Sequence, residues 1–150
     1  MQEQVLHILL VEDDDVDAEA VVRSFKKEQL EYPFTIVTNG LEALAFLRGE
    51  HERAAKSHVR PHIILLDLNM PRMNGIEFLQ ELRADEQLKD SIVFVLTTSN
   101  RDEDKLAAYN KQIAGYILKT RAGKDFTDMV TLLKCYEMIV EFPPNVGNRA

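Results

Sequence analysis

The stretch Ile63-Ile64-Leu65-Leu66-Asp67-Leu68-Asn69-Met70-Pro71 places a carboxylate at the end of an apolar run. Four consecutive large aliphatic residues without polar alternation are typical of a strand buried on both faces, as in the centre of a parallel sheet. Asp67 would then lie at the carboxyl end of that strand, where open α/β sheets bind their ligands. Asp is also a common turn residue, so this stretch alone fits both a functional and a purely structural carboxylate.

The composition indicates one globular domain. At 150 residues the chain is long enough to bury a real core. It contains no run of 18 apolar residues and no basic-then-apolar leader, so we expect neither a membrane span nor secretion. A single cysteine, Cys135, suits a reducing cytoplasm, and the net charge of −7 argues against nucleic-acid binding. The same charge leaves carboxylates available for a cation.

The period of the apolar pattern changes repeatedly along the chain, as it does when strands and helices alternate. Strands are expected at 5–11, 34–38, 63–66, 92–96 and 113–118. Helices are expected at 14–30, 39–47, 74–85, 102–110 and 124–140. The polar stretch 49–60 is interpreted as a loop or a helix extension. We expect the domain to cover 5–140, with 141–150 as a tail and no output domain.

This alternation predicts a doubly wound (βα)5 three-layer α/β sandwich, flavodoxin-like, with a parallel sheet in the order 2-1-3-4-5. In that order the sheet reverses direction between its first and third strands. The ligand crevice therefore opens after the strands at 5–11 and 63–66. Both strands are followed by acids, namely Glu12-Asp13-Asp14 and Asp67. This coincidence favours a functional role for Asp67.

Carboxylates at neighbouring strand ends repel one another. At an effective dielectric of about 20, two like charges 4 Å apart cost roughly 4 kcal/mol, which a proton or a cation must relieve. Oxygen ligands and retained waters suit Mg²⁺. The acids 13–15 could instead cap the following helix, and both roles can coexist. A calcium loop is rejected, because Ala18 and Ser24 stand where that loop needs Gly and Glu.

Two further strand ends carry polar groups. Thr97 follows the apolar run of the strand at 92–96, and Lys119 follows the strand at 113–118. Either residue alone is usually turn chemistry or solvated surface. Together with the acids they form a set suited to an acyl phosphate on an aspartate: a nucleophile, a cation and donors for the phosphoryl oxygens.

With these motifs the chain resembles the response-regulator receiver domain of two-component signalling. The matching segments are Leu10-Val11-Glu12-Asp13, Leu66-Asp67-Leu68-Asn69-Met70-Pro71 with Gly75, Val95-Leu96-Thr97-Thr98-Ser99, and Gly115-Tyr116-Ile117-Leu118-Lys119. The resemblance covers the chain from about Val5 to Val140. It implies a protein whose output is a contact with other proteins, and not an enzyme.

The resemblance also implies a role for each matching residue. Asp67 would accept a phosphoryl group from a phosphohistidine on a sensor histidine kinase. Thr97 and Lys119 would contact that group, and Tyr116 would move inward as the switch residue. A Mg²⁺ ion would be held by Glu12, Asp13, Asp67 and the backbone carbonyl of Asn69. A buried core tyrosine is the alternative for Tyr116.

Two features resemble single-domain regulators paired with bacterial phytochromes. They are the insert at 49–60 and the ending Ile139-Val140-Glu141-Phe142-Pro143-Pro144. One feature departs from the receiver pattern, which usually has a cis proline after the lysine. Here Thr120 follows Lys119, and a cis bond before a residue other than proline costs about 2.5–4 kcal/mol. We therefore predict a trans bond and a rearranged loop.

The last expected helix carries two apolar stripes. The first stripe comprises Phe126, Met129, Leu133, Tyr136 and Val140, and the second comprises Leu132, Cys135, Ile139 and Phe142. One interpretation is a deeply packed helix covered by the tail. The other is that the second stripe meets a partner, most simply in a homodimer formed through this helix and the region of the fifth strand.

Three functions remain open. The leading hypothesis is a phosphoacceptor regulator. A small aspartyl-phosphate hydrolase or phosphotransferase is the second, although such enzymes usually carry another acid near the nucleophile, where this chain has Asn69. A receiver-like scaffold that is never phosphorylated is the third, and the intact set of Asp13, Asp67, Thr97 and Lys119 argues against it.

Overall fold

The computed structural model describes residues 6–28, 32–50, 60–144 and 146. Its strands are β1 (Ile8–Val11), β2 (Phe34–Val37), β3 (Ile63–Leu66), β4 (Val93–Thr97) and β5 (Gly115–Leu118). Its α-helices are α1 (Asp15–Lys27), α2 (Gly40–Leu47), α4 (Gly75–Ala84), α5 (Asp102–Tyr109) and α6 (Thr127–Ile139). Two 3₁₀ turns, η1 (Lys119–Arg121) and η2 (Lys124–Phe126), connect β5 to α6. No helix within the described ranges is long and apolar enough to cross a membrane.

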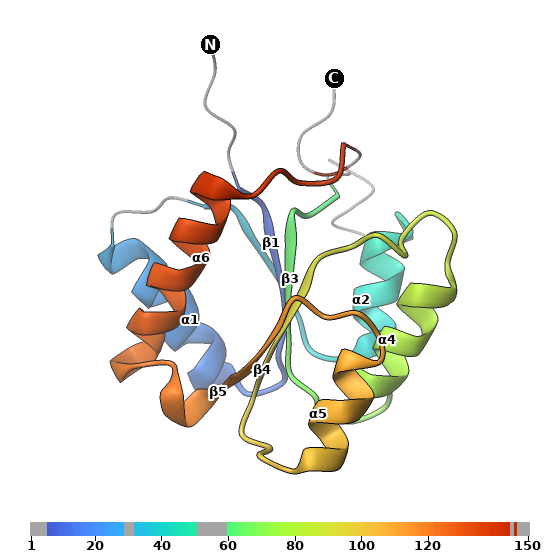
Figure 1. Ribbon diagram of the computed structural model, residues 1–150, viewed down its shortest axis with the longest axis horizontal. Helices are drawn as coiled ribbons and strands as arrows, with labels where there is room; N and C mark the ends of the chain where they lie inside the picture. Colours follow the sequence, from blue (N-terminus) through green and yellow to red (C-terminus); the bar gives the residue numbers. More distant parts are fainter. Residues whose placement is uncertain (1–5, 29–31, 51–59, 145, 147–150) are drawn as a thin grey trace.

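The strands form one parallel sheet in the order β2-β1-β3-β4-β5. Helices α1 and α6 cover one face of the sheet, and α2, α4 and α5 cover the other (Figure 1). The doubly wound fold and strand order predicted from the sequence are therefore confirmed. In this order the crevice opens where β1 and β3 end, because the chain leaves these neighbouring strands toward opposite faces.

The two central strands are buried on both faces, as the apolar runs predict. In β3, Ile63 and Leu65 pack in the core beneath α1 and α6, whereas Ile64 and Leu66 pack in the core beneath the other helices. Such double burial fixes the strand against slippage, since a shift by one residue would exchange the two side-chain sets. The position of Asp67, one residue beyond β3, is fixed with it.

Helix starts are set by side-chain caps. Asp14 caps α1, Asn39 caps α2, and Asn74 forms a capping box with Glu77 at the start of α4. Each cap accepts hydrogen bonds from otherwise unpaired backbone N–H groups. These three helices begin within one residue of their predicted positions. The interpretation of the stretch at 49–60 falls mostly on residues 51–59, which lie outside the described residues.

The predicted start of the last helix at residue 124 is wrong. The segment Lys124–Phe126 is a 3₁₀ turn in which Asp125 and Phe126 have φ angles of 52° and 65°. Such left-handed backbone cannot continue an α-helix, so α6 begins only at Thr127. Phe126 is nevertheless buried against the core, as its stripe predicts.

Two residues after α6, Phe142 and Val146, are packed or buried. The Phe142 ring contacts His62 and Tyr136, with centroid distances of 5.1 and 5.9 Å, and Val146 is buried. Phe142, the last residue of the second stripe, is thus partly buried against the protein's own core, and its predicted contact with a partner stays a prediction. The other stripe members Leu132, Cys135 and Ile139 are exposed.

Candidate functional site

The acids predicted at the crevice meet there. Val11 and Leu66 are paired in the sheet, and the Asp67 N–H donates to the Val11 carbonyl at 3.0 Å. Glu12, Asp13 and Asp67 each offer a carboxylate oxygen, and these oxygens lie within 4.8 Å of one another. Glu12 and Asp67 are buried, and Asp13 is exposed. This cluster of oxygen donors, open on one side, fits a hard divalent cation that keeps several waters.

Lys119 lies against the same acids. It follows β5 directly, and its Nζ is 2.9 Å from Glu12 Oε1 and 2.7 Å from Asp17 Oδ2. Asp67 Oδ2 is more distant, at 3.7 Å. The lysine predicted to contact a phosphoryl group is thus at the crevice, but its two hydrogen-bonding partners are the other acids.

Crowding and burial shift the acid–base behaviour of these groups. Burial raises the pKa of Glu12 to about 7, against the opposing hydrogen bond from Lys119 and with a further increase from the Asp67 charge. Burial alone would lower the pKa of Lys119, but its bonds to Asp17 and Glu12 and the Asp67 charge outweigh it and raise that pKa. The ammonium therefore stays charged at neutral pH and offsets part of the acid repulsion.

Thr97 is the last residue of β4 and is fully buried. Its Oγ1 accepts a hydrogen bond from the Ser99 N–H at 3.3 Å. Thr97 pairs with Leu118 in the sheet, so the hydroxyl and Lys119 stand at adjacent strand ends. The structure thus places the predicted hydroxyl on the same edge of the sheet as the carboxylates.

Tyr116 is bound to the loop that follows Thr97. Its hydroxyl donates to the Ser99 carbonyl at 2.9 Å, and its N–H donates to the Tyr109 hydroxyl at 3.2 Å. The Ser99 hydroxyl in turn lies 2.5 Å from Asp104 Oδ2, in the first turn of α5. The ring is partly buried and packs against the core. Tyr116 therefore links β5 to the β4–α5 loop, and its predicted movement stays a prediction.

The turn after Asp67 is held close to the strand. Asn69 is exposed, and its N–H lies 3.4 Å from Asp67 Oδ1. Gly75 donates its N–H to the Leu68 carbonyl at 3.0 Å, and a Cβ at Gly75 would lie only 2.6 Å from the Asp67 carbonyl oxygen. Only glycine permits this approach of α4 to the phosphoacceptor candidate.

The peptide bond between Lys119 and Thr120 is trans, as predicted, and the described residues contain no cis peptide bond. The three residues Lys119–Arg121 form the 3₁₀ turn η1. The Ala122 N–H closes that turn on the Lys119 carbonyl at 3.5 Å. The chain thus keeps Lys119 at the crevice without a proline behind it.

Sequence reasoning missed Asp17 as a member of the site. Asp17 is the third residue of α1, and the sequence around it gives a sufficient reason for an acid there, namely the helix dipole. Its bond to Lys119 joins residues 102 positions apart. Only the fold reveals that contact.

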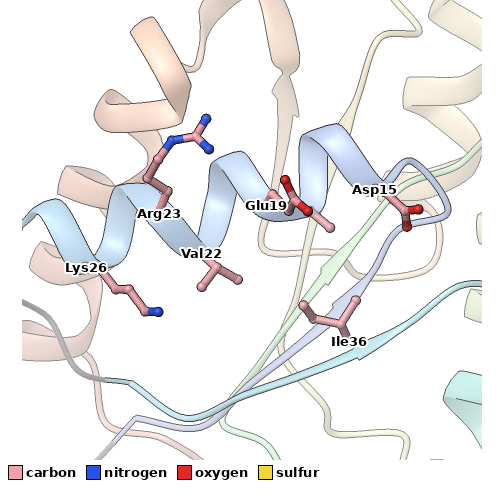
Figure 2. Close-up of a pocket in the computed structure, with 7 residues that line it drawn as sticks. Asp15, Glu19, Val22, Arg23, Lys26 and Ile36 are labelled. Atoms are coloured by element: carbon pink, nitrogen blue, oxygen red, sulfur yellow. The ribbon is translucent and has the colours of Figure 1, made fainter.

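A separate groove runs along α1 beside the edge strand β2. It has a volume of about 490 Å³, and Val22 and Lys26 of α1 line it together with Ile36 of β2 (Figure 2). Asp15 stands at one end of the groove, whereas Glu12, Asp13 and Asp67 are not among its lining residues. The acidic crevice, and not this groove, is therefore the candidate site.

Comparison with known proteins identifies the family. The response regulator receiver domain family matches residues 8–131. The chain belongs to this family. Receiver domains are components of two-component signalling, so the resemblance noted in the sequence is confirmed.

Similar receivers come from phytochrome signalling. Response regulator Rcp1 of Synechocystis sp. is 40% identical over 125 residues, which cover 82% of each chain. The phosphorylated cyanobacterial phytochrome response regulator RcpA has a TM-score of 0.82 at 31% identity, covering 93% of this chain and 99% of RcpA. The Mn²⁺-bound form of Rcp1 has a TM-score of 0.80 at 36% identity, covering 92% and 99%. The similarity to single-domain phytochrome-associated receivers is therefore confirmed.

Proposed function

We propose that this receiver is a phosphoacceptor whose Asp67 takes a phosphoryl group from a phosphohistidine of a sensor histidine kinase. The observation that carries this proposal is the meeting of three carboxylates and the Lys119 ammonium at the ends of β1, β3 and β5. An Asp67 oxygen attacks phosphorus, a P–O bond forms, and the P–N bond to the kinase imidazole breaks. The imidazole nitrogen takes up the electron pair.

Glu12, Asp13 and Asp67, with the backbone carbonyl of Asn69, would hold Mg²⁺. The crowding of their oxygens within 4.8 Å supports a cation there, because carboxylates this close repel one another without one. When bound, Mg²⁺ supplies positive charge next to the phosphoryl oxygens. The Mn²⁺-bound form of the relative Rcp1 supports the same cation class.

The remaining residues would stabilise and read the phosphoryl group. Thr97 donates its hydroxyl to one phosphoryl oxygen, and Lys119 donates its ammonium to another. When Thr97 turns toward phosphate, the bond from Ser99 to its Oγ1 breaks, and the loop that holds the Tyr116 hydroxyl moves. This chain of contacts would carry the signal from Asp67 to the face formed by α5 and β5.

The likeness to RcpA and Rcp1 supports a phytochrome-type sensor kinase in the cytoplasm as the partner. The output would be a contact with other proteins rather than with nucleic acid or a membrane. The net charge of −7 supports this output, because phosphate backbones repel an acidic surface.

Incubation with acetyl phosphate and Mg²⁺ tests the proposal. We expect a mass gain of one phosphoryl group that is labile to base. Removal of Mg²⁺ with a chelator should abolish the gain, and so should Asp67→Asn. Asp125→Asn is a matched control, because Asp125 is an exposed acid paired with Arg23 on α1. A folded wild-type protein that gains no phosphate would refute the proposal and favour a scaffold. Repeated release of free phosphate from many different phosphate esters would favour a hydrolase instead.

We further propose a homodimer formed through α6 and the region of β5. Leu132 and Ile139, 47% and 79% exposed, lie on α6 with the exposed Cys135 between them in sequence, and Met138 is 71% exposed. Contiguous exposed apolar surface usually marks an interface, and a two-fold dimer is its commonest form. Light scattering should give a dimer mass that Leu132→Ser and Ile139→Ser reduce to a monomer. A wild-type monomer at high concentration, with and without acetyl phosphate, would contradict this proposal.

A further inference from the structure

Asp17 is the partner that lies nearest to the crevice lysine. Its Oδ2 is 2.7 Å from Lys119 Nζ, whereas the Glu12 and Asp67 oxygens lie at 2.9 and 3.7 Å. The Asp17 side chain is 29% exposed and the Lys119 side chain only 10%. The contact is thus a charge-assisted hydrogen bond at the rim of the buried crevice.

The start of α1 explains why the Asp17 carboxylate is available. Asp17 is the third helical residue after the cap Asp14, where an acid commonly returns to the backbone N–H of the cap. Here the Asp14 N–H donates instead to Glu12 Oε2 at 3.2 Å. The Asp17 carboxylate therefore has no cap to complete and reaches across to Lys119.

The result is an ammonium held between two carboxylates, neither of which is Asp67. At 3.7 Å from Asp67 Oδ2, the ammonium lies beyond hydrogen-bond distance. Lys119 and Asp67 thus form an ion pair without a hydrogen bond. An Asp67 oxygen that accepted a hydrogen bond from the ammonium would be a weaker nucleophile, because the ammonium would withdraw charge and occupy a lone pair. The observed separation of 3.7 Å leaves the lone pairs of that oxygen free of a hydrogen bond from the ammonium.

We propose that Asp17 is a positioning residue, which holds Lys119 off Asp67 before phosphorylation and presents the ammonium to the incoming phosphoryl group. This inference rests on the proposed role of Asp67 as phosphoacceptor. Without the Asp17 charge, Lys119 loses one of its two hydrogen-bonded anions, and the Asp67 charge draws the ammonium inward. Asp67 then becomes a poorer nucleophile.

Phosphorylation by acetyl phosphate at saturating Mg²⁺ tests the inference. In this reaction Asp67 forms the new O–P bond, and acetate leaves with the electrons of the old one. We expect Asp17→Asn to lower the first-order rate constant about tenfold, since a misplacement of about 1 Å can cost up to 100-fold. Asp17→Glu keeps the charge and should restore most of the rate.

Asp15→Asn is the matched charge control. Asp15 lies in the same first turn of α1 and is exposed, so its neutralisation changes the field but not the lysine. Its rate should stay within about twofold of wild type. Circular dichroism and urea unfolding establish that each variant is folded.

A second measurement reports on Lys119 without metal or phosphate. The ¹H–¹⁵N NMR signal of the Lys119 ammonium should be visible in the metal-free wild-type protein, because two carboxylates slow its exchange with water. It should broaden or shift in Asp17→Asn and stay in place in Asp15→Asn.

Two results would overturn the role of Asp17 alone. One is an Asp17→Asn protein that is phosphorylated as fast as the Asp15→Asn protein, and the other is a Lys119 NMR signal that is unchanged in Asp17→Asn. A folded wild-type protein that gains no phosphate would instead overturn the proposed function, and the role of Asp17 with it. The two failures are therefore distinguishable.

Discussion

Gly75→Ala should damage both the stability of the domain and the placement of Asp67. The added Cβ would lie 2.6 Å from the Asp67 carbonyl oxygen and 2.7 Å from the Leu68 Cα. Ordinary contact begins near 3.4 Å, so the backbone atoms must separate by about 0.8 Å. Both neighbours are backbone, and no side-chain rotation can relieve the overlap.

The magnitude follows from this geometry. Overpacking in a tight core costs about 1–3 kcal/mol. Alanine's higher helix propensity gives back at most about 1 kcal/mol, and less at the first helical position. We therefore expect a net loss of about 2 kcal/mol of unfolding free energy. Because the moving group carries the phosphoacceptor, the rate of phosphorylation by acetyl phosphate should also fall, by about tenfold.

Gly115→Ala is the matched control. A Cβ there would meet only ring atoms of Phe94, at 3.2 and 3.3 Å, and a ring can turn aside. Urea unfolding at pH 7 and mass spectrometry of the phosphorylated protein measure the two effects. If Gly75→Ala unfolds at the same urea concentration as Gly115→Ala and is phosphorylated at the wild-type rate, the steric reasoning is wrong.

Two predictions concern stability away from the crevice. Arg83→Met should lower the unfolding free energy by about 3 kcal/mol or more, because the Arg83 guanidinium donates at 2.7–2.9 Å to four backbone carbonyls that would lose their partner. Urea unfolding measures this loss, with Arg23→Met as the control, because the Arg23 side chain is 60% exposed. Equal losses of unfolding free energy in the two variants would contradict the prediction. Burial and the charge of His7 lower the pKa of His62 to about 4 from 6.5, and its Nδ1 accepts the His7 N–H at 3.0 Å, so the folded state favours the neutral ring. The contribution of the neutral His62 ring to the unfolding free energy should be fully present above pH 6.5 and fall by about 3 kcal/mol as the pH drops toward 4. His62→Asn keeps a hydrogen-bond acceptor but does not titrate, so the urea midpoint of this variant should change less with pH over this range. A wild-type urea midpoint that is as independent of pH as that of the variant would count against this cause.

The sequence predicts the sheet and the acid cluster well because both depend on local patterns. The run Ile63–Leu66 has no polar alternation and is followed directly by turn residues, which is typical of a doubly buried strand. Once the strand order is known, the residues after each strand must share one edge. Glu12, Asp67 and Lys119 therefore follow from topology alone.

Three features could not be predicted, each for a physical reason. The left-handed backbone at Asp125 and Phe126 contradicts the preferences of a bulky residue, so no local signal marks the late start of α6. Phe142 continues an apolar stripe in sequence, but the extended backbone at Val140 redirects the chain and lets the ring pack on His62. The Asp17–Lys119 contact depends on side-chain reach between distant segments.

The long sequence separation within the crevice has a consequence for the newly made chain. Glu12 and Asp17 come from the first quarter of the sequence, and their counter-ion Lys119 is added about a hundred residues later. Until β5 has been synthesised and docked, an emerging chain carries its acids without the ammonium that offsets their repulsion. Contacts of such high sequence separation form late in folding. Competence to receive phosphate should therefore arise only in the completed domain, so that unfinished or truncated chains do not divert phosphoryl groups from the kinase.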